Sequence, residues 1–411
     1  MEYRNLTPFP SLVYEAIDAQ SQSFEVAVLR MTLSVEPNGT LKIADDQAPL
    51  VMVDELYGEL NKSSVKQESD LAPYKPWCDV IVVGDALAPG GKWASRFESG
   101  IRISRKGNTI VHKRITVTGP RYWKKRWLGG WRLTKPDPIQ SLPLRYEYAY
   151  GGECRVEAND SAVQRIKAKH LLTPDQRKQH PEGSEKAPVA HTCCETNPIG
   201  MGYTDSWYLR AMKINKFPAP QIESPNDPIK KFRKPYDPQG LGVIGRAWES
   251  RSNLCGTMDD HFVRSDRALP EDFDFAYWNG AHPDLQTPWL HGDETIDLIN
   301  IPISNFRSDR LDSHGNRITR LFLPGHHMCE VATMEDGKIS SRDFHIDTLI
   351  IDAEKRVVSL VYRLRLLKQL RVKRLEATML NDEGKAVLDL HCQEVTKRIQ
   401  ETNEPMEATH G

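Results

Sequence analysis

Runs of β-type residues stand on both sides of a long segment without periodicity, and this arrangement most constrains the fold. The runs 24–35 (FEVAVLRMTLSV), 78–91 and 142–150 precede the segment, and 347–353 and 357–366 follow it. They are rich in β-branched and apolar residues and are bounded by turn-forming residues, which is typical of strands. No alternation of strands with helices appears, which argues against a parallel α/β sheet. The pattern predicts a mainly β protein with a sandwich-like or barrel-like scaffold.

The segment from about 180 to 290 holds 12 of the 27 prolines, eight glycines and four of the nine tryptophans. Disordered segments are poor in aromatic residues, whereas this one is rich in them. A long irregular stretch in a compact protein is otherwise a packed set of functional loops. We therefore expect ordered loops laid over the β scaffold.

The chain has 411 residues, enough for two or three domains or for one large β domain with extensions. We expect a main domain over 1–301, which includes the irregular segment, and a C-terminal segment over 302–411 with further strands. Four apolar residues near the end follow helical spacing, so a helix is predicted over 386–401, with a frayed tail after it. This stripe consists of Val387, Leu388, Leu390 and Val395.

The charges of the chain are balanced, with 55 basic and 56 acidic side chains and a formal net charge of −1. This balance gives no overall attraction to nucleic acid or to an anionic membrane. No apolar run approaches the ~18 residues of a membrane span. The N-terminus lacks the features of a signal peptide, and seven scattered cysteines do not make a disulfide framework. We therefore expect a cytoplasmic protein with reduced cysteines.

The first half of residues 191–203 (HTCCETNPIGMGY) has side chains that could bind a metal or act as nucleophiles. Its second half has the Asn, Pro and Gly residues that are typical of turns. His191, Cys193 and Cys194 suggest half of a metal site, for which residues 326–329 (HHMC) offer a second half. Zinc sites usually use close ligand pairs at recognised spacings, and neither segment has such a spacing. No nucleophile signature surrounds the cysteines either. We expect free thiols, no bound metal and no cofactor.

Two acidic loops supply the enzyme alternative. Residues 269–280 (LPEDFDFAYWNG) place acids among aromatic residues, and residues 290–298 (LHGDETIDL) place them before a strand. Paired acids can act as general acid and base or hold a cation, although acids in turns more often bind neighbouring backbone N–H groups. The alternative is a metal-assisted hydrolase. Its candidate residues are Asp272, Asp274, His291, Asp293 and Glu294.

The segment 121–133 (RYWKKRWLGGWRL) interleaves five basic residues with four aromatic residues. Such mixtures can hold single-stranded nucleic acid, so a nucleic-acid-binding module using 121–132 is a weaker alternative. Gly129-Gly130 between aromatic runs predicts a hairpin, and Arg and Trp are enriched at protein interfaces. We expect this hairpin and the acidic aromatic loop to form a partner-binding face. The candidate contact residues are Trp123, Arg126, Trp127, Trp131, Tyr277 and Trp278.

Several short motifs follow one another in a specific order between about residues 20 and 301. They are 69–91, 142–152, 197–203, 218–229, 239–251, 269–286 and 290–301. In this order they resemble a bacterial family of uncharacterised domains encoded beside type VI secretion genes. The match includes NPIGMGY but not HTCC, so it favours the backbone interpretation of residues 191–203.

The resemblance implies a cytoplasmic, non-enzymatic adaptor or chaperone. Such a protein binds a toxic effector, often one with a PAAR domain, and helps to load it onto the VgrG spike, with no nucleic acid or membrane as partner. Charged residues beside Gly and Pro turns can satisfy loop backbone groups, so we expect those in the motifs to hold the scaffold together. These motif residues are Lys75, Asp79, Arg145, Glu147, Asn197, Arg246, Arg251, Asp272 and Glu294.

Overall fold

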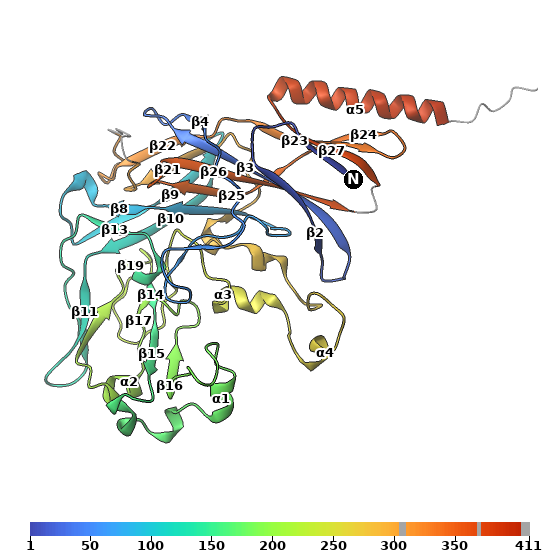
Figure 1. Cartoon of the computed structure of the whole chain (residues 1–411). Coiled ribbons are helices and arrows are strands. Elements are labelled where there is room, and N and C mark those ends of the chain that lie inside the picture. The colour runs from blue at the N-terminus through green and yellow to red at the C-terminus, as the bar shows by residue number, and fades with distance from the viewer. Residues whose placement is uncertain (304–309, 368–370, 404–411) are drawn as a thin grey trace, which may run out of the picture.

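Strands dominate the computed structural model of the protein, which describes residues 1–303, 310–367 and 371–403 (Figure 1). Strands hold 39% of the residues and helices 16%, which confirms the expected mainly β fold. The strands form several open sheets. Within the described residues, none of the helices is both long and apolar enough to cross a membrane.

The largest sheet has seven strands in the order β2-β3-β26-β25-β7-β20, with β4 paired to β3. Its strands are β2 (Ser11–Ile17), β3 (Ser23–Val35), β4 (Leu41–Ile43), β7 (Cys78–Val83), β20 (Gln286–Thr287), β25 (His345–Asp352) and β26 (Val357–Leu367). β26 pairs antiparallel with β3 along its full length, and β25 lies parallel to β7. The expected segments 1–301 and 302–411 therefore contribute neighbouring strands to one sheet.

A second sheet of five strands, in the order β19-β10-β9-β21-β22, packs against the first. Its strands are β9 (Arg96–Arg105), β10 (Asn108–Thr118), β19 (Ile222–Glu223), β21 (Thr295–Ile299) and β22 (Ile318–Phe322). Leu29 and Val80 of the first sheet share one buried apolar cluster with Ile101, Ile115 and Leu298 of the second. All six residues of β7 are buried, which explains why its residues other than Asp79 are all apolar.

A third sheet has four strands in the order β1-β27-β23-β24. Its strands are β1 (Glu2–Asn5), β23 (His327–Met334), β24 (Ile339–Asp343) and β27 (Val372–Leu380). The helix α5 (Asp382–Asn403) lies along it at the top of Figure 1 and confirms the predicted C-terminal helix.

The face of α5 that meets the sheet differs from the predicted stripe. Leu388 and Val395 are half-buried and Cys392 is buried, whereas Val387 and Leu390 are 67% and 62% exposed. The buried positions follow the spacing i, i+4, i+7, which is one helix face. The prediction is therefore wrong for two of the four residues expected to face the protein, Val387 and Leu390, because the helix face in contact with the sheet is narrower than the predicted stripe.

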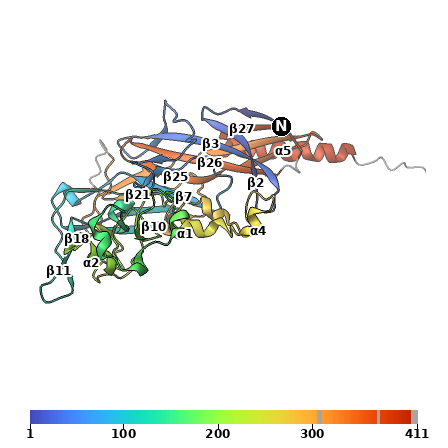
Figure 2. The same ribbon diagram turned by 60° about the horizontal axis from the view of Figure 1, so that its bottom comes forward.

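Short helices, short strands and irregular loops fill the region from about 180 to 290 that was predicted to be irregular but ordered, and residues before 180 contribute further small sheets and one more α-helix. The short helices lie below the main sheets in Figure 1 and come forward in Figure 2. The helices are α1 (Pro174–Lys178), α2 (Ser206–Ala211), α3 (Glu249–Ser252) and α4 (Asp260–Val263). Paired strands are β5 (Glu55–Leu56) with β6 (Val65–Gln67), β8 (Asp85–Leu87) with β13 (Ser141–Pro143), β14 (Tyr150–Gly151) with β17 (Met201–Gly202), and β15 (Glu153–Val156) with β16 (Ala190–Cys193). Trp207 and Trp248 are buried there, so aromatic side chains do pin the loops.

Candidate interaction site

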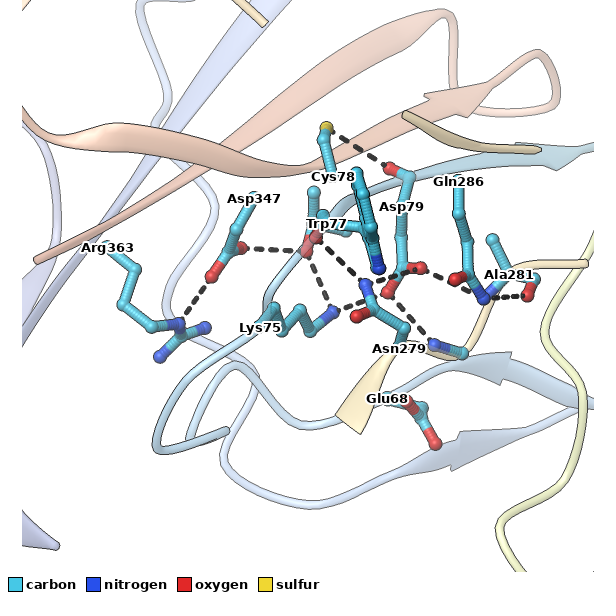
Figure 3. A network of polar contacts seen from close by, with 12 residues as sticks. Glu68, Lys75, Trp77, Cys78, Asp79, Asn279, Ala281, Gln286, Asp347 and Arg363 are labelled. Atoms are coloured by element: carbon cyan, nitrogen blue, oxygen red, sulfur yellow. Dashed lines mark hydrogen bonds and ion pairs between the residues drawn. The ribbon is translucent and has the colours of Figure 1, made fainter. Parts of the chain in front are cut away.

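Asp79, the second residue of β7, is the centre of a buried polar network (Figure 3). Its carboxylate is fully buried, and Lys75 Nζ lies 2.8 Å from Asp79 Oδ2. The carboxylate also accepts hydrogen bonds from Asn279 Nδ2 (3.1 Å) and from the backbone N–H groups of Gly280 (2.9 Å) and Ala281 (3.2 Å). A charge on the largest sheet thus fixes the end of the acidic aromatic loop.

The network continues into β25 and β26. Lys75 Nζ donates to Thr348 Oγ1 (2.9 Å), and that hydroxyl donates to Asp347 Oδ1 (2.9 Å). Arg363 Nε donates in turn to Asp347 Oδ2 at 2.5 Å. Burial by itself lowers the pKa of Lys75, but the combined attraction of the Asp79, Asp347 and Glu68 carboxylates outweighs it, so the pKa is raised and the ammonium stays charged. Two buried ion pairs are therefore joined through one hydroxyl group.

Glu68 is the centre of a second set of buried ion pairs. Arg251 Nη1 lies 2.7 Å from Glu68 Oε1 and also donates to the carbonyl of Ile244 (2.7 Å). Arg246 Nε lies 3.0 Å from the same carboxylate oxygen. Arg251 Nη2 also donates to the carbonyl of Tyr277 (2.6 Å). Both arginines come from a motif, but Glu68 itself lies in an ordinary polar stretch and was not singled out from the sequence.

Asn197, from the NPIGMGY half of residues 191–203, joins two parts of the backbone. Its side chain is fully buried, and Nδ2 donates to the carbonyls of Tyr146 (2.9 Å) and Tyr150 (3.0 Å). A Cβ at Gly200 would lie 2.4 Å from this nitrogen, and Gly202 has a φ of +97°. In this half of the stretch, backbone segments pack so closely, or with such a backbone conformation, that glycine is required.

The remaining motif residues also have partners inside the molecule. Glu294 accepts from the backbone N–H groups of His291 and Gly292, Asp272 accepts from the backbone and hydroxyl of Thr257, Glu147 accepts from the backbone and hydroxyl of Ser64, and the Arg145 guanidinium lies over the Tyr57 ring. The carboxylates of Glu294, Asp272 and Glu147 thus satisfy loop backbone groups that no sheet reaches.

Each acid of the hydrolase alternative has a partner elsewhere in the chain or in its own loop. Asp274 accepts from the backbone N–H of Ala276 (2.8 Å), and Asp293 forms an ion pair with Arg105. Within residues 1–303, 310–367 and 371–403, no group of three or more His, Cys, Asp or Glu side chains is placed to hold a metal. Asp272 and Glu294 have the local partners given above.

The HTCC half of residues 191–203 contains Cys193, whose thiol is held in the protonated form. All seven cysteines lie in the described part of the chain and are free. Burial, with the carboxylates of Glu195 and Glu153 nearby, raises the pKa of Cys193 to about 11. Burial and Asp343 raise the pKa of Cys329 to about 12. A protonated thiol is a poor nucleophile and a poor metal ligand.

The hairpin predicted around Gly129-Gly130 is present. It joins β11 (Arg121–Lys125) to β12 (Trp131–Leu133), and β18 (Lys216–Ala219) pairs with the other edge of β11. Trp127 and Leu128 at its tip are 94% and 90% exposed. Arg126, which begins the turn, is exposed as well. The tip therefore presents a large apolar surface beside a cation.

Trp123 does not belong to the exposed face, which corrects the expected set of contact residues. It is only 4% exposed and packs edge-on against Phe232, with ring centroids 5.4 Å apart. Trp131 is half-buried and stacks on Phe232 at 5.0 Å. Alternate residues of a strand face opposite sides, and the side that carries Trp123 meets the loop of Phe232. These rings form a rigid base for the hairpin.

Tyr277 and Trp278 in the acidic aromatic loop are half-buried rather than exposed. Their rings meet edge to face at 5.4 Å. The guanidinium of Arg246 lies 5.2 Å from the centre of the Trp278 ring, and that of Arg251 lies 5.6 Å from the Tyr277 ring. Both rings thus help to cover the buried ion pairs. The most exposed candidate contacts are those of the hairpin tip.

A family model described as "Uncharacterized protein conserved in bacteria (DUF2169)" matches residues 20–363. The match extends beyond residue 301 and includes β25 and most of β26, which lie inside the seven-stranded sheet. No curated protein and no solved structure matches the chain significantly. The match covers most of the 411 residues, and the chain therefore belongs to the DUF2169 family of uncharacterized bacterial proteins.

Proposed function

We propose that the protein is a non-enzymatic adaptor that binds a toxic effector of a type VI secretion system and helps to load it onto the VgrG spike. The secretion context comes from the motif resemblance. The observation that carries a binding role is the hairpin tip, where Trp127 and Leu128 are 94% and 90% exposed. Tryptophan is among the residues that contribute most to protein–protein affinity when a partner buries them.

The rest of the hairpin supports this role because it holds the tip in place. Trp123 and Trp131 anchor its base on Phe232, and Lys125 N donates to the carbonyl of Asn215 (2.9 Å). A contact group that is ordered before binding loses less conformational entropy on association. Burying the ~150–250 Å² of a tryptophan side chain at about 25 cal/mol per Å² contributes about 4–6 kcal/mol before association costs.

The motif residues support a scaffold rather than a catalytic role. The motif residues Asp79, Arg251 and Asn197 are buried and bind lysine, glutamate or backbone groups of the same chain. Such contacts hold the loops that they join in one arrangement. These contacts explain why the motifs contain charged residues without assigning those residues a catalytic role.

Co-expression with the products of neighbouring type VI secretion genes tests the proposal. The tagged protein should co-purify with one effector at a fixed stoichiometry, and deletion of its gene should abolish secretion of that effector. A complementing wild-type copy should restore secretion. Unchanged effector secretion from the deletion strain, together with no complex from any co-expressed pair, would reject the adaptor role.

A further inference from the structure

A cavity of about 530 Å³ lies on the side of the hairpin that carries Trp131, between β11 and the end of α2. Four cationic side chains and two aromatic rings are central to its lining: Lys125, Arg210, Lys213, Arg233, Trp131 and Phe232. This volume falls in the ordinary range of ligand-binding clefts, about 300–1,000 Å³. No motif singled out from the sequence included Arg210, Lys213 or Arg233.

Among the residues that the structure describes, three of the four cations lack an anionic partner. Arg233 donates to Ser206 Oγ (2.7 Å) and lies 3.8 Å from Asp205. The side chains of Lys125, Arg210 and Lys213 make no hydrogen bond or ion pair with any residue that the structure describes. Like charges gathered around one concave surface create a positive potential there, which favours an anionic ligand.

The backbone fixes the positions of these cations. Lys213 has a φ of +55°, a left-handed conformation that is uncommon for lysine, where the chain leaves α2. Ile214 N then donates to the carbonyl of Leu209 (3.0 Å). Lys125 N donates to the carbonyl of Asn215 (2.9 Å), which ties this turn to β11. The cations are therefore carried on two segments that are bonded to each other.

We propose that this cavity binds an acidic peptide segment of the partner protein. A carboxylate of the segment lies among Lys125, Arg210 and Lys213, and a neighbouring apolar side chain packs on the rings of Trp131 and Phe232. Guanidinium and ammonium groups form strong charge-assisted hydrogen bonds with carboxylates. The ligand class follows from the cavity, whereas the identity of the partner as a secretion effector rests on the proposed function.

The arrangement favours a peptide over a nucleic acid. Single-stranded nucleic acid is held by a cationic groove that follows successive phosphates. Lys124, which pairs with Arg132 on one side and Lys216 on the other, alternates to the opposite face of β11 from Lys125. The cations of the hairpin are therefore divided between two faces, and on the cavity side Lys125 joins Arg210, Lys213 and Arg233 around one site.

Fluorescence anisotropy with a labelled peptide of alternating Glu, Leu and Phe residues tests this inference, with its Gln counterpart as the uncharged probe. The pocket variant Lys125→Gln/Lys213→Gln removes two charges from the cavity. The matched control Lys124→Gln/Lys216→Gln removes two charges from the opposite face. All four side chains are exposed, so both variants should fold like the wild type, which circular dichroism can verify.

The wild type should bind the acidic peptide and not the Gln peptide. The pocket variant should bind it about tenfold or more weakly, and the control should stay within about twofold of the wild type. Equal loss in both variants, or no binding by the wild type, would overturn the inference. Tighter binding of a thymidine oligonucleotide of equal charge, abolished in the pocket variant, would overturn it in favour of a nucleic-acid site.

The same variants separate this inference from the adaptor proposal. If the pocket variant binds the effector as well as the wild type does, the pocket inference fails while the adaptor role stands. If effector secretion does not need the gene but the peptide result holds, the adaptor role fails while the site stands. Loss of effector binding in the pocket variant alone, with the control unchanged, supports both.

Discussion

Replacing Asp79 with Asn should lower the free energy of unfolding by about 3–5 kcal/mol, the usual cost of removing one partner from a buried ion pair. Asp79 is 0% exposed and Lys75 is 6% exposed, so water cannot replace the lost carboxylate. The ammonium of Lys75 would remain in the interior, hydrogen-bonded to the Thr348 hydroxyl but without the carboxylate that lies 2.8 Å from it. The amide also keeps one oxygen where the carboxylate offered two to Gly280 and Ala281.

Urea unfolding followed by tryptophan fluorescence measures this loss. Lys75→Met should be similarly destabilising, because it leaves Asp79 charged and unpaired. The double variant Asp79→Asn/Lys75→Met should be more stable than the sum of the two losses predicts, by about 0.5–3 kcal/mol. The control is Glu59→Gln, which breaks a pair with Lys62 whose side chains are both 75% exposed and should leave the unfolding curve unchanged. A loss below about 1 kcal/mol for Asp79→Asn, or strictly additive losses, would refute the reasoning.

Three other predictions concern single residues. Burial raises the pKa of Asp297, but hydrogen bonds from two arginines outweigh it and lower the pKa. The ionised Asp297 therefore stabilises the fold above the ordinary Asp pKa of 3.8, and this stabilisation is lost as the pH falls through the lower pKa of the folded state. In urea titrations, Asp297→Asn should weaken the dependence of the free energy of unfolding on acidic pH. At pH 8 the Cys193 thiol, with its pKa of about 11, should react with iodoacetamide about a hundredfold more slowly than an unperturbed cysteine, as mass spectrometry of the native protein can measure. Gly200→Ala should cost about 1–3 kcal/mol because its Cβ would lie 2.4 Å from Asn197 Nδ2, whereas Gly242→Ala meets only one atom at 3.9 Å and should be tolerated in the same assay.

The β architecture could be predicted because a buried strand requires apolar residues, and these are visible in short runs of the sequence. β3 and β7 are buried over most of their lengths, so apolar and β-branched residues fill them. The order of strands could not be predicted in the same way. β25 lies beside β7 although more than 250 residues separate them in the chain, and no local pattern records such a pairing.

In the hairpin too, features that depend on neighbouring residues could be predicted, whereas features that depend on residues far away in the sequence could not. Its two glycines predict the turn, and they have φ values of +89° and +75°. The burial of Trp123 depends on Phe232, which lies far away in sequence, so composition alone could not separate Trp123 from Trp127. Glu68 and the cavity cations Arg210 and Lys213 were missed for the same reason: each acquires its role only from residues that the fold brings near.

Effector binding by the variant Trp127→Ala/Leu128→Ala tests the proposed interface most directly. Trp123 is left unchanged because its removal would disturb the buried base of the hairpin. The control is Trp93→Ala, which removes another exposed tryptophan, 67% exposed, outside the hairpin. The folded tip variant should bind the effector at least about tenfold more weakly than the wild type, and the control should bind it normally. Wild-type yields of the complex from the folded tip variant would contradict a role of the hairpin in partner binding.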